Sequence, residues 1–123
     1  MRTRLDVDIP RDLRAPTRAR RAVEELGPAI DAEVRSDVVL LVSELVSNSV
    51  KYGGVGDLRL QIEAPEPRRL RVEVVDQGSG FEPVARSRPK TEPGGWGLHL
   101  VETLADRWGV HEGSTHVWFE IDR

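Results

Sequence analysis

The sequence DAEVRSDVVLLVSELVSNSVKYGG, residues 31–54, carries the longest helical pattern in the chain and decides its fold. Four apolar residues recur in it at the spacing of one helix face: Val38, Leu41, Val42 and Leu45. The Gly-Gly pair that closes the stretch is a typical helix end, because glycine readily adopts the conformation that terminates a helix. A helix with one apolar face must bury that face against another layer, which the rest of the chain has to supply.

Most other apolar residues alternate with polar ones, which is the pattern of strands. The predicted strands cover residues 4–9, 58–63, 70–76, 108–112 and 115–121, and further helices cover residues 15–26 and 98–108. The proline-rich stretch APEPRR, residues 64–69, predicts a turn that joins two strands in a hairpin. Hairpin strands with helices collected on one face predict an α+β two-layer sandwich with a mixed, mainly antiparallel sheet. A doubly wound parallel sheet is not expected, because helices and strands do not alternate regularly.

The composition is that of an ordinary globular protein and excludes several functions. Its 123 residues fit one domain with one core, residues 1–123. The net charge of −3 argues against non-specific binding of nucleic acid. The absence of cysteine removes disulfides, thiolate metal sites and a cysteine nucleophile. No apolar run approaches the roughly 20 residues of a membrane span, and the first ten residues lack the apolar core of a signal peptide. We therefore expect a cytoplasmic protein.

A polar stripe runs beside the apolar face of the long helix. Glu44, Asn48 and Lys51 lie at positions i, i+4 and i+7, so they share one side of the helix. This stripe is either a solvated face or a site where the oxygens of Glu44 and Asn48 hold a hard cation, with water completing its shell.

Two glycine-rich stretches indicate a flat ligand with phosphates. Asp76 ends a predicted strand in VVDQGSG, where its carboxylate can accept a hydrogen bond from the amino group of a flat ligand. The glycines after it let the backbone pass close to that ligand, although Asp, Gly and Ser are also common in plain turns. In GGWGLHLVETL, glycines lead directly into a helix, whose free N–H groups and dipole suit a phosphate. A loose helix cap is the alternative for that stretch.

Three stretches together resemble a known family. ELVSNSVKYG, DQGSG and GGWGLHLVETLADRWGV are similar, in that order, to the N, G1 and G2 boxes of the GHKL or Bergerat-fold ATPases. That superfamily includes gyrase, histidine kinases and MutL, and the resemblance spans almost the whole chain. Within it the chain is most similar to the free-standing bacterial anti-sigma-factor serine/threonine kinases, the switch kinases of sporulation and general-stress pathways.

The resemblance implies a role for each matching residue. Asn48 would ligate Mg²⁺, which bridges the phosphates of ATP, and Glu44 would be the general base for an attacking hydroxyl. Asp76 would bind the adenine amino group, directly and through water. The other implied nucleotide-binding residues are Gly78, Gly80, Gly95, Gly97, Leu98 and Thr115, with His116 as the alternative to Thr115.

The segment between Gly80 and Gly94 corresponds to the ATP lid of the family, and it is short here. Family members place a basic residue of the lid near the γ-phosphate, and the candidates are Arg86, Arg88 and Lys90. Because phosphoryl transfer depends mostly on positioning and charge neutralisation, a short lid can leave binding intact and transfer poor.

Three functions therefore compete. The first is an ATP-dependent protein serine/threonine kinase with a sigma factor and an anti-anti-sigma protein as partners and a homodimer as the implied assembly. The second is a nucleotide-responsive binding module without useful kinase activity, and the third is an interaction domain that has lost nucleotide binding. Intact Glu44 and Asn48 favour the enzyme, whereas the short lid favours the module.

The first predicted helix carries three arginines close together: Arg18, Arg20 and Arg21. They form either a solvated helix face or a face on which a partner docks.

Overall fold

The computed structural model describes residues 3–52, 56–76, 98–110 and 116–123. The strands in these residues are β1 (Thr3–Ile9), β2 (Leu58–Glu66), β3 (Arg69–Asp76), β4 (Arg107–Val110) and β5 (Val117–Asp122). The helices are α1 (Ala15–Glu24), α2 (Ala32–Tyr52) and α3 (Leu98–Leu104), with a short 3₁₀ helix, η1, at Gly27–Ala29.

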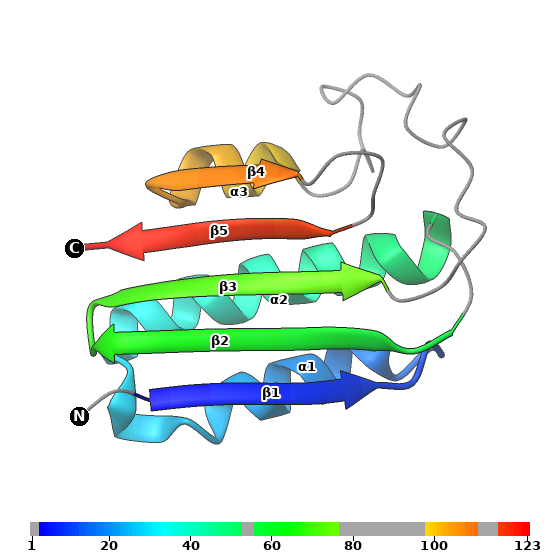
Figure 1. The fold of residues 1–123 in the computed structure, drawn as a ribbon, viewed down its shortest axis with the longest axis horizontal. Coiled ribbons are helices and arrows are strands. Elements are labelled where there is room, and N and C mark those ends of the chain that lie inside the picture. Colours follow the sequence, from blue (N-terminus) through cyan, green and yellow to red (C-terminus); the bar gives the residue numbers. More distant parts are fainter. Residues whose placement is uncertain (1–2, 53–55, 77–97, 111–115) are drawn as a thin grey trace.

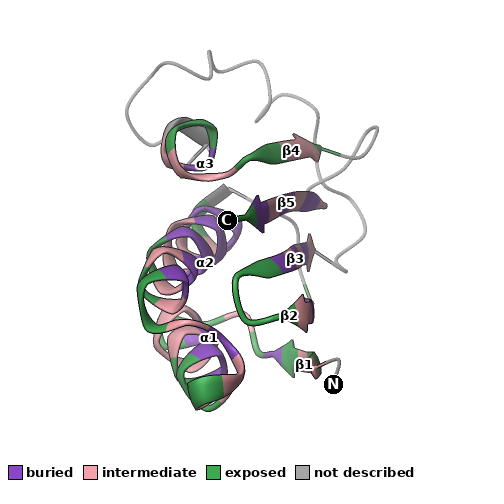
Figure 2. Cartoon of the chain, turned by 90° about the vertical axis from the view of Figure 1, so that its left-hand side faces the viewer, coloured by how far each residue is buried: buried purple, intermediate pink, exposed green. Residues whose placement is uncertain are grey.

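The strands form one sheet in the order β1-β2-β3-β5-β4 (Figure 1). Each pair of neighbouring strands in the described part of the chain is antiparallel. The helices lie on the same face of this sheet (Figure 2). This arrangement is the predicted α+β two-layer sandwich, and its described strands contain no parallel pair.

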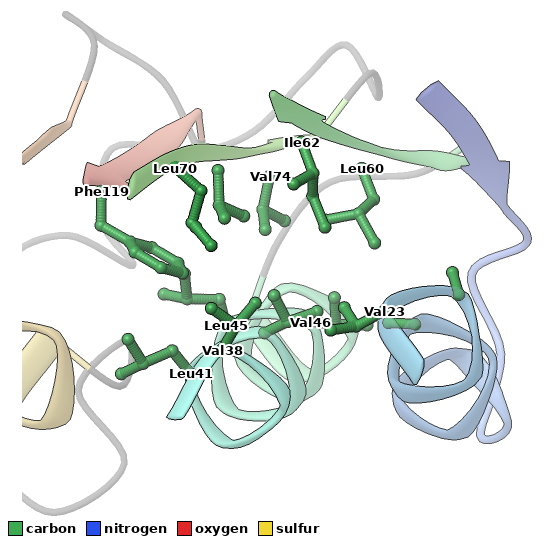
Figure 3. Packing of buried hydrophobic residues seen from close by; sticks show 14 of the residues in the cluster. Val23, Val38, Leu41, Leu45, Val46, Leu60, Ile62, Leu70, Val74 and Phe119 are labelled. Atoms are coloured by element: carbon green, nitrogen blue, oxygen red, sulfur yellow. The ribbon is translucent and has the colours of Figure 1, made fainter. Parts of the chain in front are cut away.

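The hydrophobic core fills the space between α2 and the sheet (Figure 3). Burial alternates along β2, so Leu60 and Ile62 point toward the helices and are buried. Leu45 of α2 faces the sheet from the helix layer (Figure 3). Leu41 lies beneath Phe119 of β5, which extends the same core, and both are fully buried. Because full burial of each such side chain stabilises the fold by roughly 1.5–3 kcal/mol, this contact between layers sets how α2 lies on the sheet.

Asp31 determines where α2 begins. Its Oδ2 accepts hydrogen bonds from the backbone N–H groups of Glu33 at 3.2 Å and Val34 at 3.4 Å, which caps the first turn of the helix. The same carboxylate forms an ion pair with Arg68 at 3.3 Å. The start of α2 is therefore tied to the β2–β3 turn, and the helix enters the layer in a defined position.

Two predicted boundaries are wrong, and strand pairing explains both. β2 continues through Pro65 to Glu66, so only residues 67–68 remain as the turn that was predicted over residues 64–69. A register shift between Glu63 and Glu66 accommodates the proline, which has no N–H to give to a ladder. The last predicted helix ends at Leu104 rather than at residue 108, because Arg107 and the residues after it pair with β5.

The arginines of α1 mostly make contacts within the protein. Arg18 Nη1 donates to both carboxylate oxygens of Asp12 at 2.8 Å. Arg20 Nη1 donates to the Ser43 hydroxyl of α2 at 3.0 Å, so it joins the two helices. Arg21 is exposed. Arg20 therefore lies neither on a solvated face nor on a partner-docking face, because it makes a structural contact between α1 and α2.

Candidate functional site

Segments that carry predicted site residues meet at one end of the molecule. β3 runs toward this end and finishes at Asp76, whose backbone pairs with Leu58 of β2. β5 begins there, because it is antiparallel to β3 and Val117 pairs with Val74. The C-terminal end of α2 lies at the same end, on the right of Figure 1. The topology therefore brings the turn of α2 that contains Asn48 toward the end of β3.

Asn48 is a buried polar residue near the C-terminal end of α2. It is 3% exposed, and its amide nitrogen Nδ2 has no hydrogen-bond partner among the described residues. A buried donor left without a partner costs about 1–3 kcal/mol, so Asn48 is unfavourable there unless another group meets it. The interpretation of the polar stripe as a wholly solvated face is wrong for this residue.

Glu44 and Lys51 occupy the same stripe but are more accessible. Glu44, one turn before Asn48, is half-buried, and Lys51 is exposed. Within the described part of the chain, the Glu44 carboxylate has no hydrogen-bond or ion-pair partner. An accessible carboxylate therefore lies one helical turn from a buried amide. An amide oxygen suits Mg²⁺, which takes few protein ligands and keeps several waters.

Sequence reasoning missed Arg11, which holds the end of α2. Its Nη1 donates to the backbone carbonyl of Ser49, and its Nε donates to that of Gly56 at 2.9 Å. Strand register explains this position: Ile9 pairs with Leu58, so two residues further along Arg11 comes opposite Gly56. Only the pairing of β1 with β2 could have identified Arg11, since the residues it bridges are far apart in sequence.

A charged network holds the start of β5 to β3 on the sheet face away from the helices. Glu73 Oε1 lies 2.6 Å from His116 Nε2, and Arg71 bonds to Glu73 at 3.2 Å and to Glu120 at 2.9 Å. The Arg71 guanidinium also stacks over the Trp118 ring, 4.3 Å from its centroid. Partial burial raises the pKa of Glu73, but hydrogen bonds from His116 and Arg71 outweigh this effect and lower that pKa overall. His116, the predicted alternative to Thr115, therefore contacts Glu73 within this network.

Several predicted site residues lie outside what the structure describes. For Asp76 and Leu98 it describes the backbone only, with Asp76 as the last residue of β3 and Leu98 as the first residue of α3. The remaining predicted residues lie outside the described part of the chain: Gly78, Gly80, Arg86, Arg88, Lys90, Gly95, Gly97 and Thr115.

The described residues contain no group of three His, Cys, Asp or Glu side chains that could hold a metal ion by themselves. A metal at Asn48 would therefore depend on water and on a ligand for most of its shell. None of the described helices has the length and apolar character that crossing a membrane requires.

Comparison with known proteins assigns the family. Residues 9–121 match the family model of the histidine kinase-like ATPase domain. The chain belongs to this family. The match runs from the end of β1 to β5, and so it includes the α2 turn, the end of β3 and the start of α3.

Relatives of this histidine kinase-like ATPase domain include anti-sigma F factors. The chain is 34% identical over 95 residues to that of Clostridium botulinum (strain Eklund 17B / Type B) and 35% identical over 95 residues to that of Clostridium beijerinckii. Each match covers 68% of this chain and 64% of the relative. The chain therefore spans less than two thirds of the length of these relatives.

A solved structure has the same fold. The crystal structure of the RsbU and RsbW domains of a Mycobacterium tuberculosis protein superposes with a TM-score of 0.68 over 97% of this chain, at 20% identity. The superposed part is 31% of that larger chain. At this identity the likeness shows the fold alone, and it agrees with the order of strands and helices described above.

Proposed function

We propose that this domain binds Mg²⁺-ATP and transfers its γ-phosphoryl group to a serine or threonine of a partner protein. The observation that carries the proposal is the pair on α2: the buried Asn48 amide without a partner, one turn after the accessible Glu44 carboxylate. Membership of the histidine kinase-like ATPase family supports ATP as the ligand.

Asn48 would supply an oxygen ligand to Mg²⁺, and its buried position would fix the direction of that ligand. The ion would neutralise phosphate charge, which is a major need of phosphoryl transfer. Glu44 would accept the proton of the partner's hydroxyl as the hydroxyl oxygen bonds to the γ-phosphorus and the bond from that phosphorus to ADP breaks. Asp76 would accept a hydrogen bond from the adenine amino group at the end of β3.

The names of the relatives supply one proposed partner, and the family resemblance supplies the other. Because relatives are anti-sigma F factors, we propose a sigma factor as the protein that the domain holds. The phosphorylated partner would be an anti-anti-sigma protein, released when its serine or threonine carries a phosphate. A homodimer is proposed on the family resemblance alone.

The test has a binding arm and a transfer arm. Calorimetry should detect Mg²⁺-dependent ATP binding, and Asp76→Ala should abolish most of it because an acceptor matched to a ligand donor discriminates strongly. Incubation with γ-labelled ATP and proteins captured in an ATP-dependent manner should label one of them. Unchanged ATP affinity in a natively folded Asp76→Ala protein would refute the adenine contact. ATP binding without any transfer would favour a nucleotide-responsive binding module.

A further inference from the structure

We infer that Arg11 is a positioning residue for Asn48: its guanidinium fixes the last turn of α2, and through that turn it sets the direction of the Asn48 amide. The inference rests on the proposed role of Asn48 as a metal ligand. Arg11 lies before α1, and it belongs to none of the three sequence stretches that resemble the N, G1 and G2 boxes.

Arg11 contacts α2 at its C-terminal end, where the helix has carbonyls without a partner inside the helix. The last four carbonyls of an α-helix have no partner within the helix, and in α2 these belong to residues 49–52. Arg11 Nη1 donates to the first of them, the Ser49 carbonyl, in partly buried surroundings. A positive charge also suits the negative end of the helix dipole. Arg11 therefore caps the turn that begins directly after Asn48.

The second arm of the guanidinium ties this turn to the sheet. Arg11 Nε donates at 2.9 Å to the carbonyl of Gly56, two residues before β2 begins. Gly56 has a φ of +92°, a conformation that residues with a side chain rarely adopt. The backbone at Gly56 thus has a shape that only glycine accepts readily, and its carbonyl meets Arg11.

Rigidity of this turn matters because the Asn48 amide receives little other support. Its Nδ2 has no partner in the described residues, so no hydrogen bond to that nitrogen orients the amide, and packing and the position of the backbone must set its direction. Both Asn48 and Ser49 are buried, and a shift of the helix end would move them together. Groups that orient a metal ligand from behind typically change metal affinity by about 10–100-fold when removed.

The experiment compares Arg11→Ala and Arg11→Lys with Arg21→Ala, a control arginine that is exposed on α1. The Mg²⁺ concentration for half-maximal ATP binding is expected to rise by about 10-fold or more in Arg11→Ala. Arg11→Lys keeps the charge without the two-armed fork and should lie between the parent and Arg11→Ala. Affinity for nucleotide without Mg²⁺ should change by less than about 2-fold. General loosening of the fold would instead weaken nucleotide binding equally with and without Mg²⁺.

Hydrogen exchange of the ligand-free protein gives a readout that does not depend on ATP. Amides of residues 50–52 should exchange faster in Arg11→Ala than in Arg21→Ala. Unchanged exchange there, or equal loss of metal-free and Mg²⁺-dependent binding, would overturn the inference. If Arg11→Ala fails to fold, the Arg11→Lys series decides the outcome by the same two criteria. Failure of the parent itself to bind Mg²⁺-ATP would instead overturn the proposed function and the metal part of this inference together.

Discussion

On helix α2, Leu41 and Asn48 are both buried, yet burial has opposite effects on the two residues. Leu41 gains free energy by leaving water for the core beneath the sheet. Asn48 loses hydrogen bonds to water, and the described residues give its Nδ2 nothing in return. The comparison separates the part of the helix that builds the fold from the part that costs stability, and the second part is where we propose the function.

Truncating a side chain on the apolar side of α2 should lower the stability of the fold. Leu41→Ala is expected to lower the free energy of unfolding by about 2–5 kcal/mol, because it leaves a cavity in a fully buried position. Denaturant titration measures this change. Its control is Leu40→Ala, since Leu40 is 45% exposed on the same helix and should change stability by no more than about 0.5 kcal/mol. Equal destabilisation by the two variants would contradict the orientation of α2.

Removing the carboxylate of the polar side should break the reaction without altering the fold. Glu44→Ala is expected to reduce phosphoryl transfer by about 10²-fold or more, the usual scale for a missing general base. ATP affinity should stay within a few-fold, because the carboxylate acts on the partner's hydroxyl. Glu33→Ala, an exposed glutamate in the first turn of α2, should transfer at the parent rate. Parent-like transfer by Glu44→Ala would rule out the base assignment.

Replacing the buried amide of the polar side with an apolar side chain should remove the Mg²⁺ effect on ATP binding without lowering stability. Asn48→Leu removes a buried donor without a partner, so the free energy of unfolding should rise by about 1 kcal/mol or stay constant. The same variant should bind ATP no better with Mg²⁺ than without it. Ser36→Leu adds the same side chain at an exposed site of α2 and should leave the Mg²⁺ effect intact. A large loss of stability in Asn48→Leu would show that the amide has a structural partner after all.

The smallest expected effect is on the outer face of the sheet, where folding stability depends on pH through Glu73. Burial raises the pKa of Glu73, but hydrogen bonds from His116 and Arg71 lower it overall from its ordinary value of 4.5. The folded state then binds protons less readily than the unfolded state, so this stabilisation is complete above about pH 4.5 and is lost as the pH falls through the lowered pKa.

Thermal unfolding of Glu73→Gln should therefore depend less on pH below about 4.5 than unfolding of the parent. The difference is expected to be below about 1 kcal/mol, because the pair is only partly shielded from solvent. Glu24→Gln, at an exposed position of α1, serves as the control. Identical pH profiles for the parent and Glu73→Gln would mean that the network does not stabilise the fold in this range.

Local patterns in the sequence predicted the architecture well. The apolar spacing of residues 31–54 predicted α2, and the alternation of residues 58–63 and 70–76 predicted the central hairpin, since these periods follow from helix and strand geometry alone. The alternation of residues 115–121 predicted the last strand, in which the structure buries Val117, Phe119 and Ile121 on one face. Motif spacing also indicated the ATPase family, which the family match confirms.

Tertiary structure decided what depends on neighbours distant in sequence. Pro65 lies in β2 and Arg107 in β4 because strands pair there, and a pairing partner is not visible in the local pattern. Arg11 meets Ser49 and Gly56 only because β1 and β2 share one register. The sequence by itself determined which residues are apolar and how they repeat. Which polar residue is enclosed was decided by packing, because burial of Asn48 depends on every element that closes around the end of α2.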